Sequence, residues 1–379
     1  MIKVLCAIGT RPEAIKMAPV ISALMKRRGC VVRICVTAQH REMLDQVLRL
    51  FGLRPHIDLD VMRPNQGLAA TTNRILAGMD RVLMRERPDW VVVHGDTTTA
   101  MTSGLAAFYR HIRVAHVEAG LRSGNYLEPF PEELNRRVAD QVSTLLFAPT
   151  TSAAANLRRE GVSADRIRIT GNTVVDALRA ISRLPAPRRV RQITSRLDGR
   201  ALVLVTAHRR ENIGRHLTSI CDAIAIVARR LPDDVQFVYP VHMNPNISGP
   251  VHKMLGGVPN VTLTAPLDYV EFVHLLRACR CVMTDSGGIQ EEAPTFKKPV
   301  LVLRERTERP EAVRCGSARI VGTDTARIVA TLTRVLTTDR WQRKLRHLEN
   351  PFGDGFASKR IVSALLESTA GPRGPARQT

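Results

Sequence analysis

The sequence predicts an α/β protein with two doubly wound, Rossmann-like domains that face a cleft. Three observations lead to this class. The chain has 379 residues, which is more than one hydrophobic core usually organises. Short apolar runs alternate with longer amphipathic stretches, the pattern of parallel sheets covered on both faces. Polar clusters follow these runs in both halves of the chain, and such sheets bind ligands beyond the carboxyl ends of their strands.

The expected strands fall into two series. The first consists of residues 4–8, 31–36, 90–93, 114–117, 145–148 and 167–170. The second consists of residues 201–205, 237–241, 261–263, 281–284 and 299–303. Stretches with apolar residues at helical spacing lie between them and include residues 13–26, 41–50, 215–230 and 271–279.

The strand pattern is interrupted between residues 180 and 200 by two prolines and several arginines. We therefore predict an N-terminal Rossmann-like domain over residues 1–171 and a C-terminal Rossmann-like domain over residues 172–357, with a hinge near residues 171–176. Residues 358–368 are amphipathic and predict a closing helix that packs back towards the N-terminal domain. Residues 369–379 are rich in Gly, Pro and Arg, which is typical of disorder.

The net charge of +21 is compatible with nucleic acid, a membrane surface or an acidic substrate. The arginines are dispersed, and only 4% of the residues are aromatic, so a base-stacking platform and a nucleic-acid partner are not predicted. The positive electrostatic field of such a chain would help to attract a diphosphate substrate. No apolar run reaches bilayer length and the N-terminus lacks a signal pattern, which predicts a cytoplasmic protein without a membrane partner.

Several reaction classes lose support from missing motifs. The seven cysteines are scattered and none forms Cys-x-x-Cys, so buried free thiols are expected rather than metal ligands. His-Glu-x-x-His, Gly-x-Ser-x-Gly, the P-loop and Gly-x-Gly-x-x-Gly are all absent from the sequence. Their absence argues against zinc, acyl-transfer, ATP and nicotinamide chemistry.

Three acidic residues follow predicted strands: Asp96 and Glu118 directly, and Glu132 within the next loop. Carboxylates at such positions suit the removal and return of a proton, because their surroundings can tune their pKa values. Capping of the following helix is the alternative for Asp96 and Glu132.

Cationic side chains at the same strand ends could hold a diphosphate, since guanidinium forks match phosphate oxygens. These are Arg11, Lys16, Arg122, Arg136, His208, Arg209 and Arg309, and structural ion pairs are the alternative for each. The segment Asp285-Ser286-Gly287-Gly288 begins a helix after a strand. Its backbone N–H groups could approach an anion, and an ordinary serine N-cap is the alternative.

Several long motifs occur together in one order. They include Gly-Thr-Arg-Pro-Glu-Ala-Ile-Lys at residues 9–16, His-Gly-Asp-Thr-Thr at 94–98, His-Val-Glu-Ala-Gly-Leu-Arg at 116–122, Phe-Pro-Glu-Glu-Leu-Asn-Arg at 130–136 and His-Arg-Arg-Glu-Asn at 208–212. Residues 37–41, 171–173, 284–294 and 308–311 complete the set. Through these motifs the chain resembles the bacterial non-hydrolysing UDP-N-acetylglucosamine 2-epimerases, from residue 2 to about residue 365.

This resemblance implies a glycosyltransferase-B-like fold, a homodimer and the reversible conversion of UDP-N-acetylglucosamine to UDP-N-acetylmannosamine for cell-surface polysaccharide. UDP would leave across the C1–C2 bond and return through a glycal intermediate, with no NAD, metal or other cofactor. The resemblance gives acid–base roles to Asp96, Glu118 and Glu132, and places His208 at the departing UDP. It implies substrate contacts for Arg11, Lys16, Arg136, His242, Phe272, Ser286, Gly287, Gly288, Glu292 and Arg309.

The family also has an effector region that binds a second substrate molecule. The matching positions are Gln39, His40, Gln66 and His242. Residues 63–66 read Arg-Pro-Asn-Gln, which departs from the Arg-Gln pair of strongly regulated members and leaves activation by substrate open. A hydrolysing epimerase, an epimerase of a modified UDP-HexNAc and a glycosyltransferase of the same architecture remain alternatives.

Overall fold

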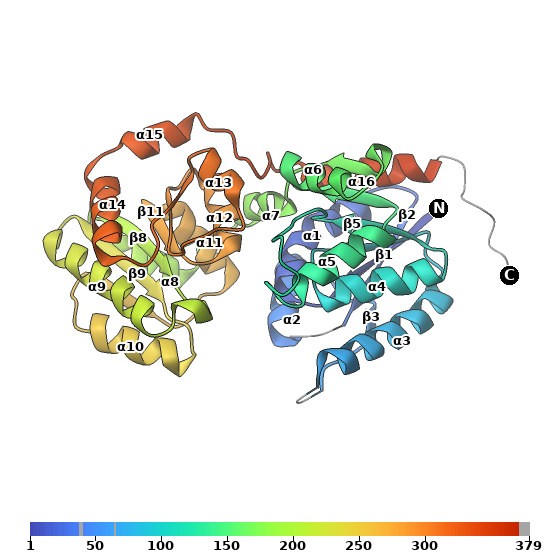
Figure 1. The fold of residues 1–379 in the computed structure, drawn as a ribbon, viewed down its shortest axis with the longest axis horizontal. Helices are drawn as coiled ribbons and strands as arrows, with labels where there is room; N and C mark the ends of the chain where they lie inside the picture. The colour runs from blue at the N-terminus through green and yellow to red at the C-terminus, as the bar shows by residue number, and fades with distance from the viewer. Residues whose placement is uncertain (38–40, 64–65, 371–379) are drawn as a thin grey trace. The chain divides into compact units, whose positions relative to one another are not determined.

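The computed structural model describes residues 1–37, 41–63 and 66–370 (Figure 1). Its contacts divide the chain into two compact units. Unit 1 is Met1–Ala177 together with the C-terminal stretch from Gly353, and unit 2 is Leu178–Phe352. The division falls within helix α7 (Thr173–Ile181). Most of the tail predicted to be disordered, residues 371–379, lies outside the described residues.

Unit 1 contains a parallel seven-stranded sheet with the order β3-β2-β1-β4-β5-β6-β7. The strands are β1 (Ile2–Ile8), β2 (Cys30–Val36), β3 (Ile57–Asp58), β4 (Trp90–His94), β5 (Arg113–Val117), β6 (Leu145–Ala148) and β7 (Ile167–Ile169). All six strands predicted for this half are present. Strand β3 was missed because two residues are too few for any hydrophobic period to be visible.

The helices of unit 1 cover both faces of its sheet (Figure 1). Helix α1 (Arg11–Met25) contacts α2 (Arg41–Leu50) and the C-terminal α16 (Ala357–Ala370). On the other face, α4 (Thr98–Tyr109) contacts α3 (Leu68–Glu86) and α5 (Glu132–Val142). Helix α6 (Thr151–Arg159) lies between β6 and β7 in the chain. This double winding places the ends of β1, β4 and β5 at the centre of one sheet edge.

The C-terminal helix α16 is fixed to unit 1 at both of its ends. The Asp176 carboxylate accepts hydrogen bonds from the backbone N–H of Ala357 at 3.2 Å and of Ser358 at 2.9 Å, at the start of the helix. Near its end, Trp90 Nε1 donates to Thr369 Oγ1 at 2.8 Å. A carboxylate at a helix N-terminus satisfies donors that the helix itself leaves open, which explains why this segment returns to unit 1.

Unit 2 contains a parallel six-stranded sheet with the order β10-β9-β8-β11-β12-β13. The strands are β8 (Ala201–Thr206), β9 (Val235–Pro240), β10 (Val261–Thr264), β11 (Cys281–Thr284), β12 (Val300–Val302) and β13 (Ala318–Ile320). The five predicted strands are present, and β13 was missed because Arg319 interrupts its three residues.

The helices of unit 2 also cover both sheet faces. On one face α9 (Arg215–Arg230) contacts α10 (Pro245–Leu255) and α14 (Thr325–Thr337), and on the other α8 (Arg188–Ser195) contacts α11 (Tyr269–Ala278). The short helices α12 (Gly287–Glu292) and α13 (Pro310–Arg314) follow β11 and β12, and α15 (Arg340–Arg346) follows α14. The predicted α/β class with two parallel-sheet domains is confirmed.

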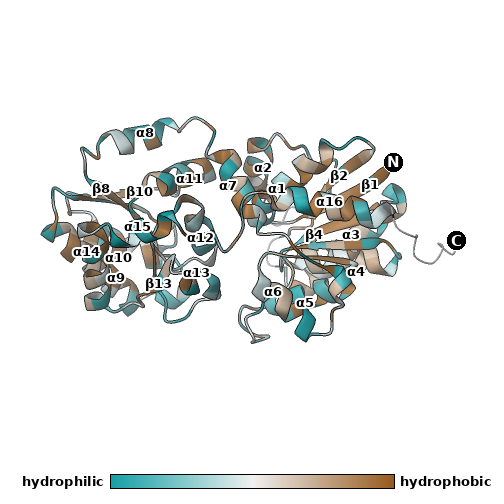
Figure 2. Ribbon diagram, turned by 90° about the horizontal axis from the view of Figure 1, so that it is seen from above, coloured by the Kyte–Doolittle hydropathy of each residue, from teal (hydrophilic) through white to brown (hydrophobic). Residues whose placement is uncertain are grey.

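The cores of both units consist of the strands and the inner helix faces. Strands β1 and β2 carry mostly hydrophobic residues (Figure 2), and the side chains of residues 4–8 are fully buried. All seven cysteines are free, and five of them are buried. Burial raises the pKa of Cys35 and of Cys279 to about 12, so these thiols remain protonated at neutral pH. Among the described residues, no helix is both long and apolar enough to cross a bilayer.

Candidate active site

The carboxyl ends of β1, β4 and β5 lie side by side in the sheet of unit 1. The polar clusters predicted from the sequence, residues 9–11, 94–96 and 116–118, lie at these strand ends and in the loops directly after them. Gly9 is required there by space, because a Cβ atom at this position would lie 2.1 Å from Thr99 Oγ1. The backbone of the first loop therefore approaches the start of α4 more closely than any other residue allows.

Glu118 is the most strongly perturbed acid at this edge. Its φ is +67°, a left-handed conformation that costs energy in a residue with a side chain and is concentrated at functional sites. Its Oε2 accepts hydrogen bonds from Lys16 Nζ at 2.5 Å and from Asn172 Nδ2 at 2.8 Å. Burial acts to raise the pKa of Glu118, but Lys16 and His94 outweigh it, so the pKa lies well below the usual carboxyl value.

Lys16 lies on α1 with its side chain only 13% exposed. The resemblance implied a contact between Lys16 and the substrate. In the structure its ammonium group forms an ion pair with Glu118, so its first role is to hold that carboxylate ionised.

Asp96 forms an ion pair with Arg136, which lies on α5 and donates to Asp96 Oδ2. Asn135 Nδ2 donates to the Asp96 carbonyl oxygen at 3.0 Å. The alternative that Asp96 caps the next helix is wrong, because the N-cap of α4 is Thr97, whose hydroxyl accepts from Ala100 N–H. With its side chain 34% exposed, Asp96 is accessible to a ligand.

Glu132 and Glu133 are adjacent on α5 but differ in their surroundings. Glu133 is buried and takes part in ion pairs with Arg136 and Arg137 at 3.4 and 3.0 Å. Glu132 does not cap α5, because Pro131 occupies the N-cap position without a side-chain bond. Its Oε2 is buried and has no hydrogen-bond partner among the described residues. Burying a carboxylate oxygen without a hydrogen-bond partner costs folding free energy, and such an atom is therefore often functional. This favours Glu132 over Glu133 as a reacting group.

Glu13 organises the first loop, and no role was predicted for it from the sequence. Its Oε2 accepts from the backbone N–H of Gly9 at 3.1 Å and of Thr10 at 2.7 Å, and its Oε1 accepts from Thr97 Oγ1. Burial raises the pKa of Glu13 against these hydrogen bonds. The sequence feature that could have predicted this role is the Thr-x-x-Glu capping box at the start of α1.

The two remaining arginine candidates of unit 1 have opposite surroundings. Arg122 donates to Asp140 at 2.6 Å and to Glu160 at 2.5 Å, with its side chain 7% exposed. It is therefore a structural ion pair rather than a phosphate ligand. Arg11 begins α1 and makes no hydrogen bond or ion pair with the rest of the described chain, so its guanidinium group is available to a ligand.

In unit 2 the corresponding edge is organised by Asp285, which follows β11 and is fully buried. Its Oδ2 accepts from the backbone N–H of His208 and Arg209, both at 2.8 Å, and from Asn212 Nδ2 at 2.9 Å. The sequence placed Asp285 in a motif without a role. The structure shows that it fixes the loop carrying His208.

His208 stacks on His242, with ring centroids 5.8 Å apart and planes 9° apart. Its Nδ1 lies 3.7 Å from Asp285 Oδ1. Partial burial lowers the pKa of His208 although Asp285 opposes the change, so the ring is largely neutral at physiological pH. His242 Nδ1 also accepts from Asn244 N–H at 3.1 Å, which orients the second ring.

Two guanidinium groups converge on the start of α12. A Cβ atom on Gly287 would lie 3.9 Å from both Arg209 Nη2 and Arg309 Cζ. Arg309 is oriented by Glu291, which accepts from its Nε. Ser286 is the N-cap of α12 but its side chain makes no capping hydrogen bond, so the serine-cap alternative is not supported. Ser286, Gly287 and Gly288 therefore form a small-residue surface beside two cations.

The other predicted positions are placed as follows. Phe272 lies in the first turn of α11, and Tyr269 from the same turn donates to Glu292 Oε1 at 3.3 Å. Gln66 in unit 1 accepts from Arg74. Gln39 and His40 lie outside the described residues.

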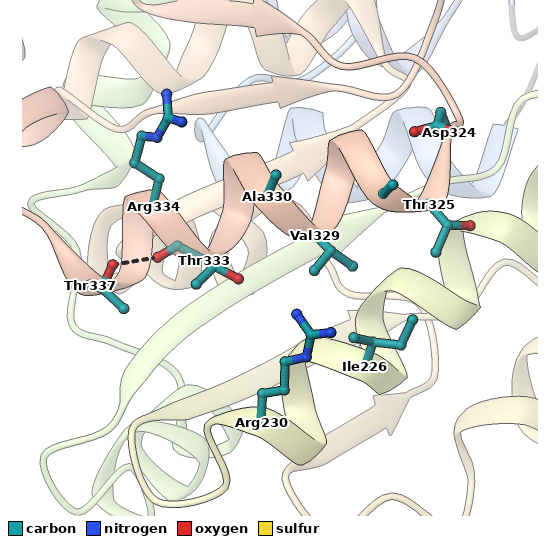
Figure 3. A pocket seen from close by; sticks show the side chains of 10 residues that line it. Ile226, Arg230, Asp324, Thr325, Val329, Ala330, Thr333, Arg334 and Thr337 are labelled. Carbon is teal, nitrogen blue, oxygen red and sulfur yellow. Dashed lines mark hydrogen bonds between the residues drawn. The ribbon is translucent and has the colours of Figure 1, made fainter.

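A broad hollow of about 830 Å³ lies elsewhere, between α9 and α14 (Figure 3). It is lined by residues such as Ile226, Arg230, Val329 and Thr333. Asp324, its one acidic residue, is occupied as the N-cap of α14 and accepts from Arg327 N–H at 2.7 Å. The described residues that line it belong to α9, α14 and the N-cap of α14, and none of the candidate site residues is among them.

Two Rossmann-like units, one with a carboxylate set at its sheet edge and one with a cationic set, define an enzyme of the glycosyltransferase-B-like fold. The family model described as UDP-N-acetylglucosamine 2-epimerase matches residues 22–366. The chain is 50% identical over 369 residues to the UDP-N-acetylglucosamine 2-epimerase of Yersinia pestis, covering 96% of this chain and 98% of that one. It is 49% identical to the Escherichia coli K12 enzyme of the same name, with the same coverage.

Solved structures agree with this comparison. The crystal structure of UDP-GlcNAc 2-epimerase from Neisseria meningitidis bound to UDP-GlcNAc superposes with a TM-score of 0.88 at 45% identity, covering 97% of this chain and 100% of that one. The chain therefore belongs to the UDP-N-acetylglucosamine 2-epimerase family, whose members are isomerases.

Proposed function

We propose that this enzyme interconverts UDP-N-acetylglucosamine and UDP-N-acetylmannosamine by inverting C2 of the sugar, without NAD or a metal ion. The relatives' names support the substrate. The observation that carries the chemistry is the ionised Glu118 carboxylate, buried at the sheet edge with a lysine on one oxygen. A base of this kind can remove a proton from carbon only when it is deprotonated before each turnover.

The proposed reaction is an elimination followed by a re-addition. A carboxylate takes the proton from C2, the electron pair forms the C1–C2 double bond of a glycal, and the C1–O bond to UDP breaks. A second carboxyl group returns a proton to the opposite face of C2 while a UDP oxygen bonds again to C1. We assign these two roles among Glu118, Asp96 and Glu132, with Glu118 as the base in one direction.

The charge that develops on departing UDP requires cations and hydrogen-bond donors. Unit 2 supplies them in our proposal: Arg209 and Arg309 beside Gly287, and His208 on its Asp285-fixed loop. Guanidinium groups stabilise the leaving diphosphate, and a histidine can donate to its oxygen.

The proposed reaction is tested by incubating the purified protein with UDP-N-acetylglucosamine in D2O. Proton NMR should show both epimers with deuterium at C2 and no free sugar at early times. A requirement for added NAD, or release of free N-acetylmannosamine and UDP as the first products, would refute the proposal. The second outcome would indicate the hydrolysing alternative.

We also propose that the enzyme is a homodimer of the cytoplasm. Met84 of α3 and Phe108 and Tyr109 of α4 are 48–63% exposed, and such apolar groups on contacting helices suit a protein interface. Seven free thiols fit a reducing compartment. Light scattering after gel filtration should give twice the 42.0 kDa chain mass, and a monomeric mass at micromolar concentration would contradict the dimer.

A further inference from the structure

His94 is a buried histidine that the assigned chemistry does not use. It is the last residue of β4, and its side chain is 5% exposed. Neither ring nitrogen has a hydrogen-bond partner within the described part of the chain. Leaving a buried polar group without a partner costs on the order of 1–3 kcal/mol, so its surroundings call for an explanation.

The neighbouring strand offers a direct contrast. His116 of β5 pairs in register with Val93, one residue before His94. Its Nδ1 is 2.7 Å from Asp140 Oδ1 and its Nε2 is 2.7 Å from the Gly95 carbonyl oxygen. His116 is thus held on both sides, as expected for a structural histidine. His94 is not.

The groups that face His94 come from each neighbouring element. Glu118, after β5, has its Oε2 3.7 Å from His94 Nε2. Glu13 of α1 is close enough for His94 to lower its pKa. Lys16, also on α1, bonds to the same Glu118 oxygen. The imidazole therefore lies among two carboxylates and one ammonium group.

Three groups of unit 1 converge on one oxygen of Glu118. Lys16 and Asn172 donate to Oε2, and His94 Nε2 is the third polar atom directed at it. No other described residue bonds to Oε1. The carboxylate is therefore anchored through Oε2, which leaves Oε1 as the atom that can exchange a proton with a ligand.

We propose that His94 is a positioning residue that, together with Lys16, anchors Glu118 through Oε2 so that Oε1 faces the reacting carbon in the ionised state. This inference rests on the proposed epimerase function. His94 does not touch the substrate in this account. It acts through Glu118. The distance from His94 Nε2 to Glu118 Oε2 is 3.7 Å, so a small movement of the carboxylate would let Nε2 donate a hydrogen bond to it.

The direction of the pH effect follows from the charges. Lys16 and His94 both lower the pKa of Glu118. Removing His94 raises that pKa, so Glu118 becomes protonated at a higher pH than in the wild type as the pH falls. The acid limb of the pH profile of kcat should then move to higher pH, while KM for the UDP-sugar changes little because the UDP groups lie in unit 2.

The test compares His94→Asn with His94→Gln. The Gln amide can place a donor near the position of Nε2, whereas the Asn amide reaches only the position of Nδ1. We expect the acid limb of His94→Asn to lie roughly one pH unit above that of the wild type, so that its deficit in kcat is largest on the acid side and shrinks as the pH rises. His94→Gln should shift the acid limb less than His94→Asn.

His116→Gln serves as the matched control, because it also removes a buried imidazole but not one that faces Glu118. It should lower the unfolding temperature without moving the acid limb. An unmoved limb in His94→Asn, or equal rate losses for Asn and Gln at every pH, would overturn the proposal and leave His94 structural. If His94→Asn does not fold, His94→Leu takes its place because it fills similar space without a donor, and an unmoved limb in that variant has the same consequence. Failure of the epimerase proposal itself would appear separately, as wild-type protein that incorporates no deuterium at C2.

Discussion

Glu118 of unit 1 and Asp285 of unit 2 both directly follow a central strand, but their hydrogen-bond partners differ in kind. Each is the first residue after a central strand, β5 or β11, and each has a buried side chain. Glu118 is bound by a cation and an amide, all on one oxygen. Asp285 is bound by two backbone N–H groups and an amide, also on one oxygen.

The difference lies in what the partners do. Backbone N–H groups cannot move or lose a proton, so Asp285 fixes the shape of a loop and orients His208. A lysine supplies charge without fixing the backbone, so Glu118 is kept ionised at a point where the chain itself is strained. In the proposed function Glu118 is a reacting carboxylate and Asp285 a scaffolding one, and the type of donor that each accepts from is what distinguishes them.

The largest expected effect is on catalysis by Glu118. Glu118→Gln keeps the volume and the acceptor for Lys16 but removes the base, and should lower kcat by roughly 10²–10⁴-fold. UDP affinity, measured by calorimetry, should stay close to that of the wild type because the groups proposed to bind UDP belong to unit 2. If Glu118→Gln kept near-normal turnover, the base would have to be Asp96 or Glu132 instead. We expect the same decrease in kcat for Asp96→Asn and for Glu132→Gln.

The counterpart in unit 2 is Asp285→Asn. Its charge-assisted hydrogen bonds to three N–H donors become neutral ones, which should lower the free energy of unfolding by about 1–3 kcal/mol. UDP binding should weaken at the same time, because the His208 loop loses its anchor. Urea unfolding and calorimetry measure the two effects. If UDP affinity were unchanged while kcat fell as in Glu118→Gln, the distinction between the two carboxylates would fail.

A smaller effect is expected for Arg309→Ala. Its guanidinium group faces Gly287 and is oriented by Glu291, so its loss should weaken UDP binding about tenfold, or ~1.4 kcal/mol. Arg319→Ala is the matched control in the same unit, since Arg319 stacks on Trp341. Equal UDP affinity in Arg309→Ala and Arg319→Ala would mean that the nucleotide site is misplaced.

The sequence predicted the sheets well because buried parallel strands are continuous apolar runs. It also placed Asp96, Glu118 and His208 at strand ends, since parallel strands share one end of the sheet. It could not predict that Lys16 pairs with Glu118, because the two residues are 102 positions apart and no local period links them. Likewise, only the tertiary structure distinguishes Glu132 from Glu133. The same holds for His116, which is hydrogen-bonded, and His94, which has no hydrogen-bond partner among the described residues.

The smallest effect is expected at the exposed Arg360–Asp354 ion pair of unit 1, which tests whether pairing alone explains Glu118. Arg360 donates to Asp354 at 2.6–2.7 Å and lowers the pKa of Asp354 to about 2, but both side chains are about half exposed. Because solvent screens such pairs, Arg360→Ala should lower the free energy of unfolding by less than about 1 kcal/mol at pH 7.

The pH dependence of this loss can also be predicted. The folded-state pKa of Asp354 lies below its unfolded value, so the ion pair stabilises the fold above the usual carboxyl pKa and this stabilisation fades as the pH falls towards 2. Thermal unfolding should therefore show a smaller gap between variant and wild type at pH 3 than at pH 7, with kcat unchanged. A loss of kcat comparable to that of Glu118→Gln would show that the chemistry responds to the stability of unit 1 as a whole rather than to the charge held at Glu118.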